Sequence, residues 1–305
     1  MTPTSFDPII AKGRDMVFRT YNDNLAVTED YRKLHDFLVQ TGNREFTYAR
    51  FDWMMTNRDY LEVQYVKHIG LWEEKGKLVA AVLFDHTMDV TVPLTLPGFD
   101  FLYPQMVDYA KKHMTKPEQP FLVYAGDENG ALQTVLQKLG MKKTTEREHT
   151  AIFDLSEKIK ERPLKAGYRL TDLLENRDFE GYLHCLFRGF DHEVNGEIFS
   201  FCGEETTLAY EREYVDLRLK ISVVDAQGQH IAHAGMWYDS KAEFALVEPV
   251  CTVPRLRGQG FGAAALTEGL RRVKALGAKY AVVGSDQPFY YALGFAPCAS
   301  GTIWK

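Results

Sequence analysis

The chain of 305 residues has few cysteines and lacks a long apolar run. Its four cysteines, Cys185, Cys202, Cys251 and Cys298, lie far apart and show none of the paired spacings typical of a zinc site. We therefore expect reduced thiols and no bound metal. No window of about 18 apolar residues is present, so we expect no membrane-spanning helix and no membrane partner. The first residues lack a basic segment followed by an apolar run, which predicts that no signal peptide is present.

The sequence also has no excess of basic residues. The chain carries 36 Lys and Arg against 42 Asp and Glu, a formal net charge of -6. A nucleic-acid-binding protein usually presents a basic field, so we expect no nucleic-acid partner. A hydrophobic content of 45% and a charged content of 26% are typical of a soluble globular protein. The length suits two domains of about 150 residues. Reduced thiols and these absences together predict a cytoplasmic location.

The most informative motif that is present lies near the C-terminus. Arg257-Gly258-Gln259-Gly260-Phe261-Gly262 stands between a strand-like run, Ala245–Val253, and a run with helical spacing of apolar residues, Ala263–Lys274. Where a strand, a Gly-rich turn and a helix N-terminus follow one another, successive backbone N–H groups converge and the helix dipole adds partial positive charge. Without Cβ atoms, an anion can approach the backbone closely. The motif therefore predicts an anion site.

Two other interpretations of this motif remain. Gly258, Gly260 and Ala263 also fit the G-x-G-x-x-G/A dinucleotide pattern, and Asp286 lies roughly twenty residues further on, where a ribose-binding carboxylate would stand. A dinucleotide fold needs several further strand–helix units after the turn, whereas one strand and a short tail remain here. The second alternative is a Gly-rich turn that binds nothing.

The R-x-x-G-x-G spacing resembles the GNAT superfamily of acyl-CoA-dependent N-acyltransferases. In that family the loop cradles the pyrophosphate of acetyl-CoA, and the preceding strand pairs with the pantetheine arm. Phe289–Phe295 is similar to the family's Y-x-x-x-G-F segment, whose tyrosine lies close to the thioester sulfur. Lys279–Gly284 fits the parallel strand between the two motifs. The resemblance assigns cofactor contacts to Val250, Cys251, Thr252, Arg257, Gly258, Gln259, Gly260, Phe261, Gly262 and Ala263.

The rest of the chain indicates a tandem duplication. A basic, proline-containing stretch, Lys158–Gly167, is typical of a linker. In the first half, Leu132–Met141 repeats the pattern of Phe289–Phe295, and the two glycines lie 294 − 140 = 154 residues apart. We expect an α/β fold with a mixed sheet (α+β) in two GNAT-like domains. The first, residues 1–160, would be degenerate, and the second, residues 166–305, would bind acetyl-CoA.

The first half lacks the functional residues. Leu136 stands where Tyr290 stands, and no R-x-x-G-x-G lies between residues 83 and 121. That interval holds three prolines, Pro93, Pro97 and Pro104. We expect these to prevent a regular strand–loop–helix anion site. Tandem GNAT members with one degenerate half are similar, and by this resemblance the first domain would shape the acceptor cleft.

The resemblance implies that Tyr290 is the catalytic acid. A phenol with a pKa near 10 is protonated at neutral pH and can donate its proton to a departing thiolate. The alternative is a tyrosine that only packs, and the adjacent Tyr291 is the weaker candidate. Arg257 either packs or contacts phosphate, the alternative being a solvated surface arginine.

The catalytic base is assigned to Glu248, on the strand before the loop, where family members place an acidic residue. It would accept the amine proton directly or through a water, or else bind the substrate ammonium or face solvent. His233 and Asp239 are alternatives, although the apolar context of His233 favours a core residue. Cys251 suggests an acyl-enzyme, but it lies mid-strand with no histidine near it in sequence, which favours a buried filler.

These observations predict an acetyl-CoA-dependent N-acyltransferase that moves an acetyl group to an amine through a direct ternary complex. Acetyl-CoA would be the co-substrate, and the acceptor a small-molecule amine or a protein or peptide amine. Asp191, Glu193 and Glu197 would suit a cationic amine, or would simply be a solvated loop. The alternatives are a non-catalytic acyl-CoA-binding or sensing protein of the same fold and an acyltransferase for a longer acyl-CoA. The sequence leaves monomer and homodimer equally open.

Overall fold

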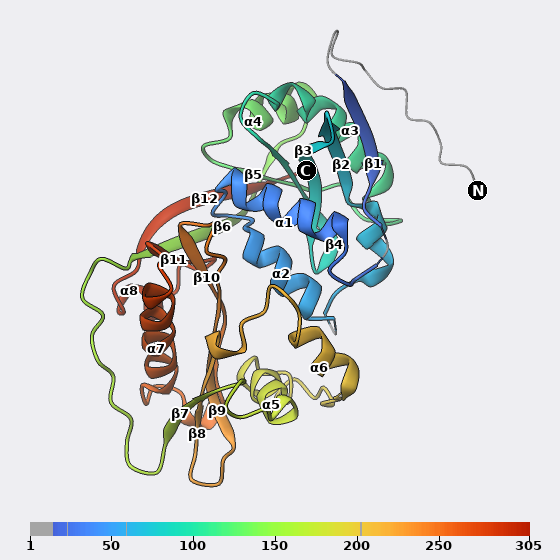
Figure 1. Cartoon of the computed structure of the whole chain (residues 1–305). Coiled ribbons are helices and arrows are strands. Elements are labelled where there is room, and N and C mark those ends of the chain that lie inside the picture. The colour runs from blue at the N-terminus through green and yellow to red at the C-terminus, as the bar shows by residue number, and fades with distance from the viewer. Residues whose placement is uncertain (1–14, 23, 59, 202) are drawn as a thin grey trace. The chain divides into compact units, whose positions relative to one another are not determined.

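The computed structural model describes residues 15–22, 24–58, 60–201 and 203–305 (Figure 1). Cys202 and the N-terminal residues that bear on a signal peptide lie outside these ranges. The contacts divide the chain into two compact units, of which unit 1 runs to His149 and includes Ala299–Lys305, while unit 2 comprises Thr150–Cys298. The sequence predicted domains at 1–160 and 166–305. The last seven residues therefore fall in the second predicted domain, whereas the structure places them in unit 1. Within the described ranges, no helix is both long and apolar enough to cross a membrane.

Unit 1 contains a mixed sheet with strand order β1-β2-β3-β4-β5-β12. Neighbouring strands are antiparallel except β4 and β5, which run parallel. The strands are β1 (Met16–Thr20), β2 (Gly70–Glu74), β3 (Lys77–Asp85), β4 (Thr87–Thr95), β5 (Val123–Gly126) and the end of β12 (Ala296–Trp304). The helices are α1 (Glu29–Thr41), α2 (Tyr48–Thr56), α3 (Tyr103–His113) and α4 (Gly130–Lys138), with 3₁₀ turns at Val63–His68 and Asp100–Leu102.

Unit 2 contains sheet strands in the order β6-β11-β10-β9-β8-β7. Only β10 and β11 run parallel. The strands are the end of β6 (Lys143–Asp154), β7 (Arg169–Asp172), β8 (Lys220–Val224), β9 (His230–Trp237), β10 (Phe244–Thr252) and β11 (Tyr280–Val283). The helices are α5 (Phe179–Gly189), α6 (Glu204–Tyr210), α7 (Phe261–Ala275) and α8 (Pro288–Tyr291), with 3₁₀ turns at Leu217–Leu219 and Pro254–Leu256.

The two halves of the chain repeat one order of elements. β1, α1, α2, β2, β3, β4, α3, β5, α4 and β6 correspond in order to β7, α5, α6, β8, β9, β10, α7, β11, α8 and β12. The last strands are exchanged: β12 pairs with β5 in unit 1, and β6 pairs with β11 in unit 2. Gly140 and Gly294 follow α4 and α8 with φ of 77° and 104°. The predicted fold class, a mixed α/β sheet in two tandem copies, is confirmed.

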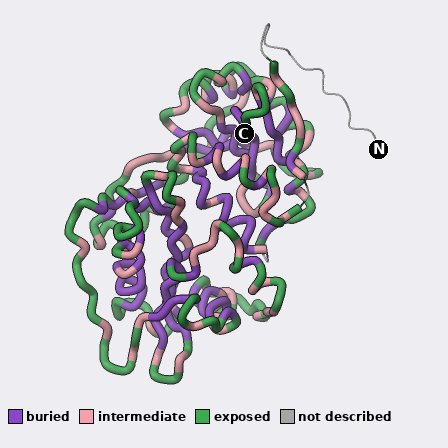
Figure 2. The backbone as a smooth tube through the Cα atoms, viewed as in Figure 1, coloured by how far each residue is buried: buried purple, intermediate pink, exposed green. Residues whose placement is uncertain are grey.

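Helix α7 packs closely on the sheet of unit 2 and places the Gly-rich loop at its N-terminus. Figure 2 shows the buried stretch along α7 and the strands beneath it. Small side chains allow this approach, since a Cβ at Gly269 would lie 2.8 Å from Cγ of Met236. The N-terminal turn is likewise built from Gly262 and three buried alanines, so the loop lies directly over the end of β10.

The prolines of the first half leave both the strand and the helix around them regular, and their expected effect on an anion site stays a prediction. Thr91 donates its N–H to Leu122 in the segment leading into β5, and by strand alternation the nitrogen of Pro93 points the same way. Within the described residues, β4 and β5 pair at Thr91–Val123, which lies before Pro93, so Pro93 removes no ladder hydrogen bond there. Pro104 lies in the first turn of α3, where a helix leaves its N–H groups unbonded in any case.

The C-terminal strand should stabilise unit 1. Trp304 is 2% exposed, so Trp304→Ala should lower the free energy of unfolding by about 3–5 kcal/mol. Leu139→Ala, at a side chain 56% exposed in the same unit, is the control and should change it by less than about 0.5 kcal/mol. Urea denaturation followed by circular dichroism measures both. Equal stability of the two variants would contradict this role of β12.

Candidate active site

The site begins where β10 and β11 part. They pair at Phe244–Tyr280, Ala245–Ala281 and Leu246–Val282, after which β11 ends at Val283 and β10 continues to Thr252. Val253 donates its N–H to the carbonyl of Ile231 beside β9 at 2.9 Å. Because backbone groups alternate along a strand, the N–H groups of Val250 and Thr252 face the opposite, open edge. The parted strands thus present backbone donors to a gap.

A bulge in β10 places Glu248 at this gap. The register with β9 shifts between Val247 and Val250, across the cis peptide bond from Glu248 to Pro249. The indole N–H of Trp237 donates to the carbonyl oxygen of Glu248 at 2.8 Å. A Cβ at Gly235 would collide with that same oxygen. Trp237 and Gly235 therefore fix the bulge from the neighbouring strand.

The Gly-rich loop has the backbone geometry of an anion site. Gly258 and Gly260 have φ of 74° and 88°, in the left-handed region that favours glycine. Helix α7 starts directly after Gly260, and no side chain caps it. Its first N–H groups are therefore left for water or a bound anion. A Cβ at Gly262 would lie 3.0 Å from Oγ1 of Thr252, so the helix start can lie close to β10 because that residue is glycine.

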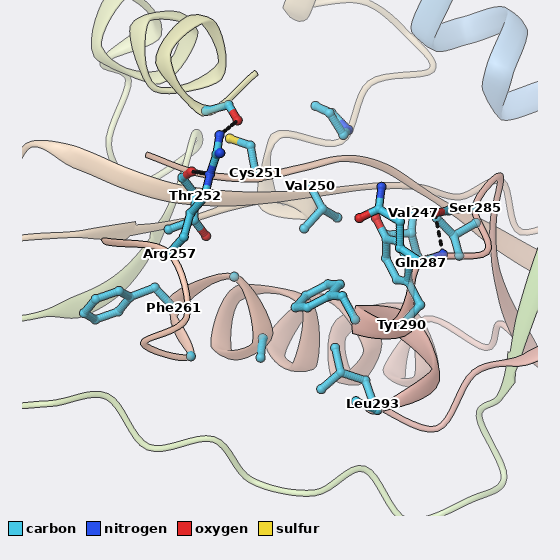
Figure 3. A pocket seen from close by; sticks show the side chains of 18 of the residues that line it. Val247, Val250, Cys251, Thr252, Arg257, Phe261, Ser285, Gln287, Tyr290 and Leu293 are labelled. Carbon is cyan, nitrogen blue, oxygen red and sulfur yellow. Dashed lines mark hydrogen bonds between the residues drawn. The ribbon is translucent and has the colours of Figure 1, made fainter. Parts of the chain in front are cut away.

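Arg257 ties this loop to the end of α5. Its Nη2 donates to the carbonyl of Gly189 and to Oδ1 of Asp191, both at 2.8 Å, and its Nε donates to the carbonyl of Thr252 at 3.2 Å (Figure 3). The guanidinium thus packs against protein acceptors and holds the loop in place.

The acidic residues after α5 are all engaged within their own region. Asp191 pairs with Arg257, Glu193 lies 3.5 Å from Nε of Arg188, and Glu197 lies 2.8 Å from Nδ1 of His192. Two of the three carboxylates thus lie beside an arginine and the third beside a histidine, so each already has a partner in the protein.

Tyr290 reaches the same cleft from α8. Its side chain is 7% exposed and lies beside Val247 (Figure 3). Burial raises the pKa of Tyr290 above its ordinary value, and the nearby Glu248 carboxylate and Cys251 raise it further. Among the described residues, none forms a hydrogen bond with its hydroxyl, which stays protonated at neutral pH. Tyr291 is 36% exposed and does not line the cleft.

The cleft formed by these elements has a volume of about 820 Å³, within the range of small-molecule sites. It brings together every predicted site residue except Gln259: Val250, Cys251, Thr252, Arg257, Gly258, Gly260, Phe261, Gly262, Ala263, Glu248 and Tyr290. Three polar residues that the motifs did not identify also line it: Arg162, Ser285 and Gln287. Ser285 accepts the N–H of Gln287 at 3.2 Å, and Arg162 comes from the linker. No sequence pattern marks them, because only the folded chain brings them to the loop.

The alternative catalytic residues lie elsewhere. His233 is fully buried, its Nδ1 lies 3.1 Å from Oγ of Ser222, and burial lowers its pKa well below the ordinary value. Asp239 does not line the cleft. Cys251 pairs with His233 across β9 and β10, but a hydrogen bond with Cys185 and burial raise the pKa of its thiol well above the ordinary value. The thiol and the imidazole are therefore both neutral.

Several solved structures share this fold. A tandem GNAT protein from the clavulanic acid biosynthesis pathway aligns with a TM-score of 0.58 and 13% identity, over 95% of this chain and 98% of that chain. A GCN5-related N-acetyltransferase from Sphaerobacter thermophilus aligns with a TM-score of 0.56 and 12% identity, over 95% and 94% of the two chains. One from Kribbella flavida aligns with a TM-score of 0.50 and 17% identity, over 74% and 85%.

No protein-family model and no curated protein matches the sequence. The structural likenesses show that the chain has the tandem GNAT fold, as the motifs and the repeat predicted. In the described part of the chain, no group of three or more His, Cys, Asp or Glu side chains is arranged to hold a metal ion.

The bulge in β10 should depend on glycine at position 235. Gly235→Ala places a methyl group against the Glu248 carbonyl oxygen, and we expect the free energy of unfolding to fall by about 1–3 kcal/mol. Gly284→Ala, in the same cleft, is the matched control, because a Cβ there meets nothing within 4 Å. Chemical denaturation of both variants measures the difference. Similar losses in the two would show that the strand, not this carbonyl, dictates the effect.

Proposed function

We propose that the protein is an acetyl-CoA-dependent N-acetyltransferase that acts on an amine. One observation carries the proposal: a parted strand edge, an uncapped Gly-rich helix N-terminus and a buried, protonated tyrosine line a single cleft. A thioester of coenzyme A fits these features, since its pyrophosphate needs backbone N–H donors and its amide-containing arm needs a strand edge.

Binding would be divided between two elements. The N–H groups that follow Gly260 would hold the pyrophosphate, while the outward N–H groups of Val250 and Thr252 and the carbonyl of Val250 would pair with the pantetheine amides. Acetyl-CoA supplies the activated acetyl group. Holding both reactants in one cleft converts the transfer into an effectively intramolecular step.

Two side chains would move protons. Glu248 would accept a proton from the acceptor amine, directly or through a water, and Tyr290 would donate one to the departing thiolate. Because the pKa of Tyr290 is raised, the phenol keeps its proton throughout the neutral range. Backbone N–H groups of β10 would stabilise the negative charge on the thioester oxygen. The acceptor would be a small-molecule or peptide amine.

Acetyl-CoA should bind to the Gly-rich loop. Calorimetric titration should give a micromolar Kd, and the Arg257→Ala/Gly260→Asp double variant should abolish binding, because it releases the loop from α5 and adds a carboxylate at a position with φ of 88°. Gly228→Asp is a matched control for the second change, since Gly228 has φ of 82° and lies outside the cleft. No binding to the wild-type chain would refute the proposed function.

Tyr290→Phe should separate catalysis from binding. Loss of a general acid should lower kcat/KM in a thiol-release assay by about a hundredfold, with the Kd for acetyl-CoA changed less than about twofold. Tyr291→Phe should change neither. Since the pKa of Tyr290 lies above 10, deprotonation of this group should not lower the wild-type rate below about pH 10. Binding without turnover of any amine would favour the sensing alternative, and tighter binding of longer thioesters would favour a larger acyl group.

A further inference from the structure

The linker between the two repeats lies against the Gly-rich loop. Nζ of Lys165 donates to Oε1 of Gln259 at 3.2 Å. The ring of Tyr168, just after the linker, lies 4.5 Å from the ring of Phe261 at the start of α7. These contacts hold the linker beside the anion site, although 94 residues separate Lys165 from Gln259.

The linker also places a cation in the cleft. Arg162 is exposed and lines the cleft together with Gly260, Phe261 and Gly262. Within the described ranges, no side chain or carbonyl bonds to its guanidinium. The other arginine of the cleft, Arg257, is already bonded to Gly189 and Asp191. Arg162 is therefore the arginine of the cleft that is available to an anion.

The local charge favours an anion as well. The segment 158–167 carries four cations, Lys158, Lys160, Arg162 and Lys165, against the single anion Glu161, a net charge of 4 − 1 = +3. Segment 254–263 adds Arg255 and no acidic residue, while the charge of its other arginine, Arg257, is paired with Asp191. In a chain with a net charge of -6, this concentration of positive charge around one loop attracts polyanions.

We propose that Arg162, assisted by Lys165, binds the phosphate monoester on the ribose of coenzyme A. This inference rests on the proposed function. The N–H groups at the start of α7 provide for the pyrophosphate, so a cation that reaches the cleft from a separate segment suits the phosphate that lies apart from it. A guanidinium can bind a phosphate through two parallel hydrogen bonds. The linker is thus part of the coenzyme site and selects for the phosphorylated nucleotide.

The test is calorimetric titration of the full chain with coenzyme A and with 3′-dephospho-coenzyme A. The wild-type protein should bind coenzyme A more tightly. Arg162→Ala should weaken coenzyme A binding about tenfold and leave binding of the dephospho form within about twofold, because only the first ligand loses a charged hydrogen bond. Lys165→Ala should show a smaller loss of the same kind.

Lys160→Ala is the matched control, since it removes one positive charge from the same linker but neither lines the cleft, as Arg162 does, nor bonds to the Gly-rich loop, as Lys165 does through Gln259. It should change both affinities by less than about twofold. Equal wild-type affinity for the two ligands would overturn the inference, as would an equal effect of Arg162→Ala on both or an equal effect of Lys160→Ala and Arg162→Ala. Each of these outcomes leaves coenzyme A binding itself intact. Failure of the wild-type chain to bind coenzyme A would instead refute the proposed function.

Discussion

The parting of β10 from β11 after Leu246 and Val282 is the constraint on which the rest of the cleft depends. A strand that loses its neighbour exposes N–H and C=O groups that need partners. On the other side, β9 keeps its pairing through the bulge, where the Trp237 indole donates to the Glu248 carbonyl. Nζ of Lys220 lies 3.1 Å from the centroid of that indole and donates to the carbonyl of Met236. One edge of β10 is thus rigidly held while the other remains open to a ligand.

In unit 1 the corresponding strands, β4 and β5, also separate, and side chains there connect the strand ends. β4 and β5 share the pair Thr91–Val123, and their ends are then linked through one phenol. The hydroxyl of Tyr103, at the start of α3, accepts hydrogen bonds from Thr95 at 3.1 Å and from Asn129 at 2.9 Å. Thr95 ends β4, and Asn129 caps the helix that follows β5. In this copy, side chains link the strand ends where the other copy has an uncapped Gly-rich helix start.

The sequence was sufficient where local chemistry decides the structure. Glycines with positive φ, the apolar run of β10 and the helical spacing of α7 led to the correct strand, loop and helix. It was insufficient where tertiary contacts decide. Pro93 is tolerated because β4 is unpaired with β5 at that position. Arg162 belongs to the cleft only because the linker folds back, which no motif encodes.

The exchange of last strands gives the first repeat a place beside the functional residues of the second. β6, from the first repeat, pairs with β11 in unit 2 and brings Phe153 to within 5.5 Å of Phe295, measured between ring centroids. Phe295 in turn lies 5.6 Å from the ring of Tyr290. A Cβ at Gly294 would lie 3.1 Å from the ring of Phe153, so glycine is needed for this close contact. Glycine also suits the φ of 104° at this position. The last strand of the first repeat therefore packs through Phe153 and Phe295 behind the tyrosine of the second.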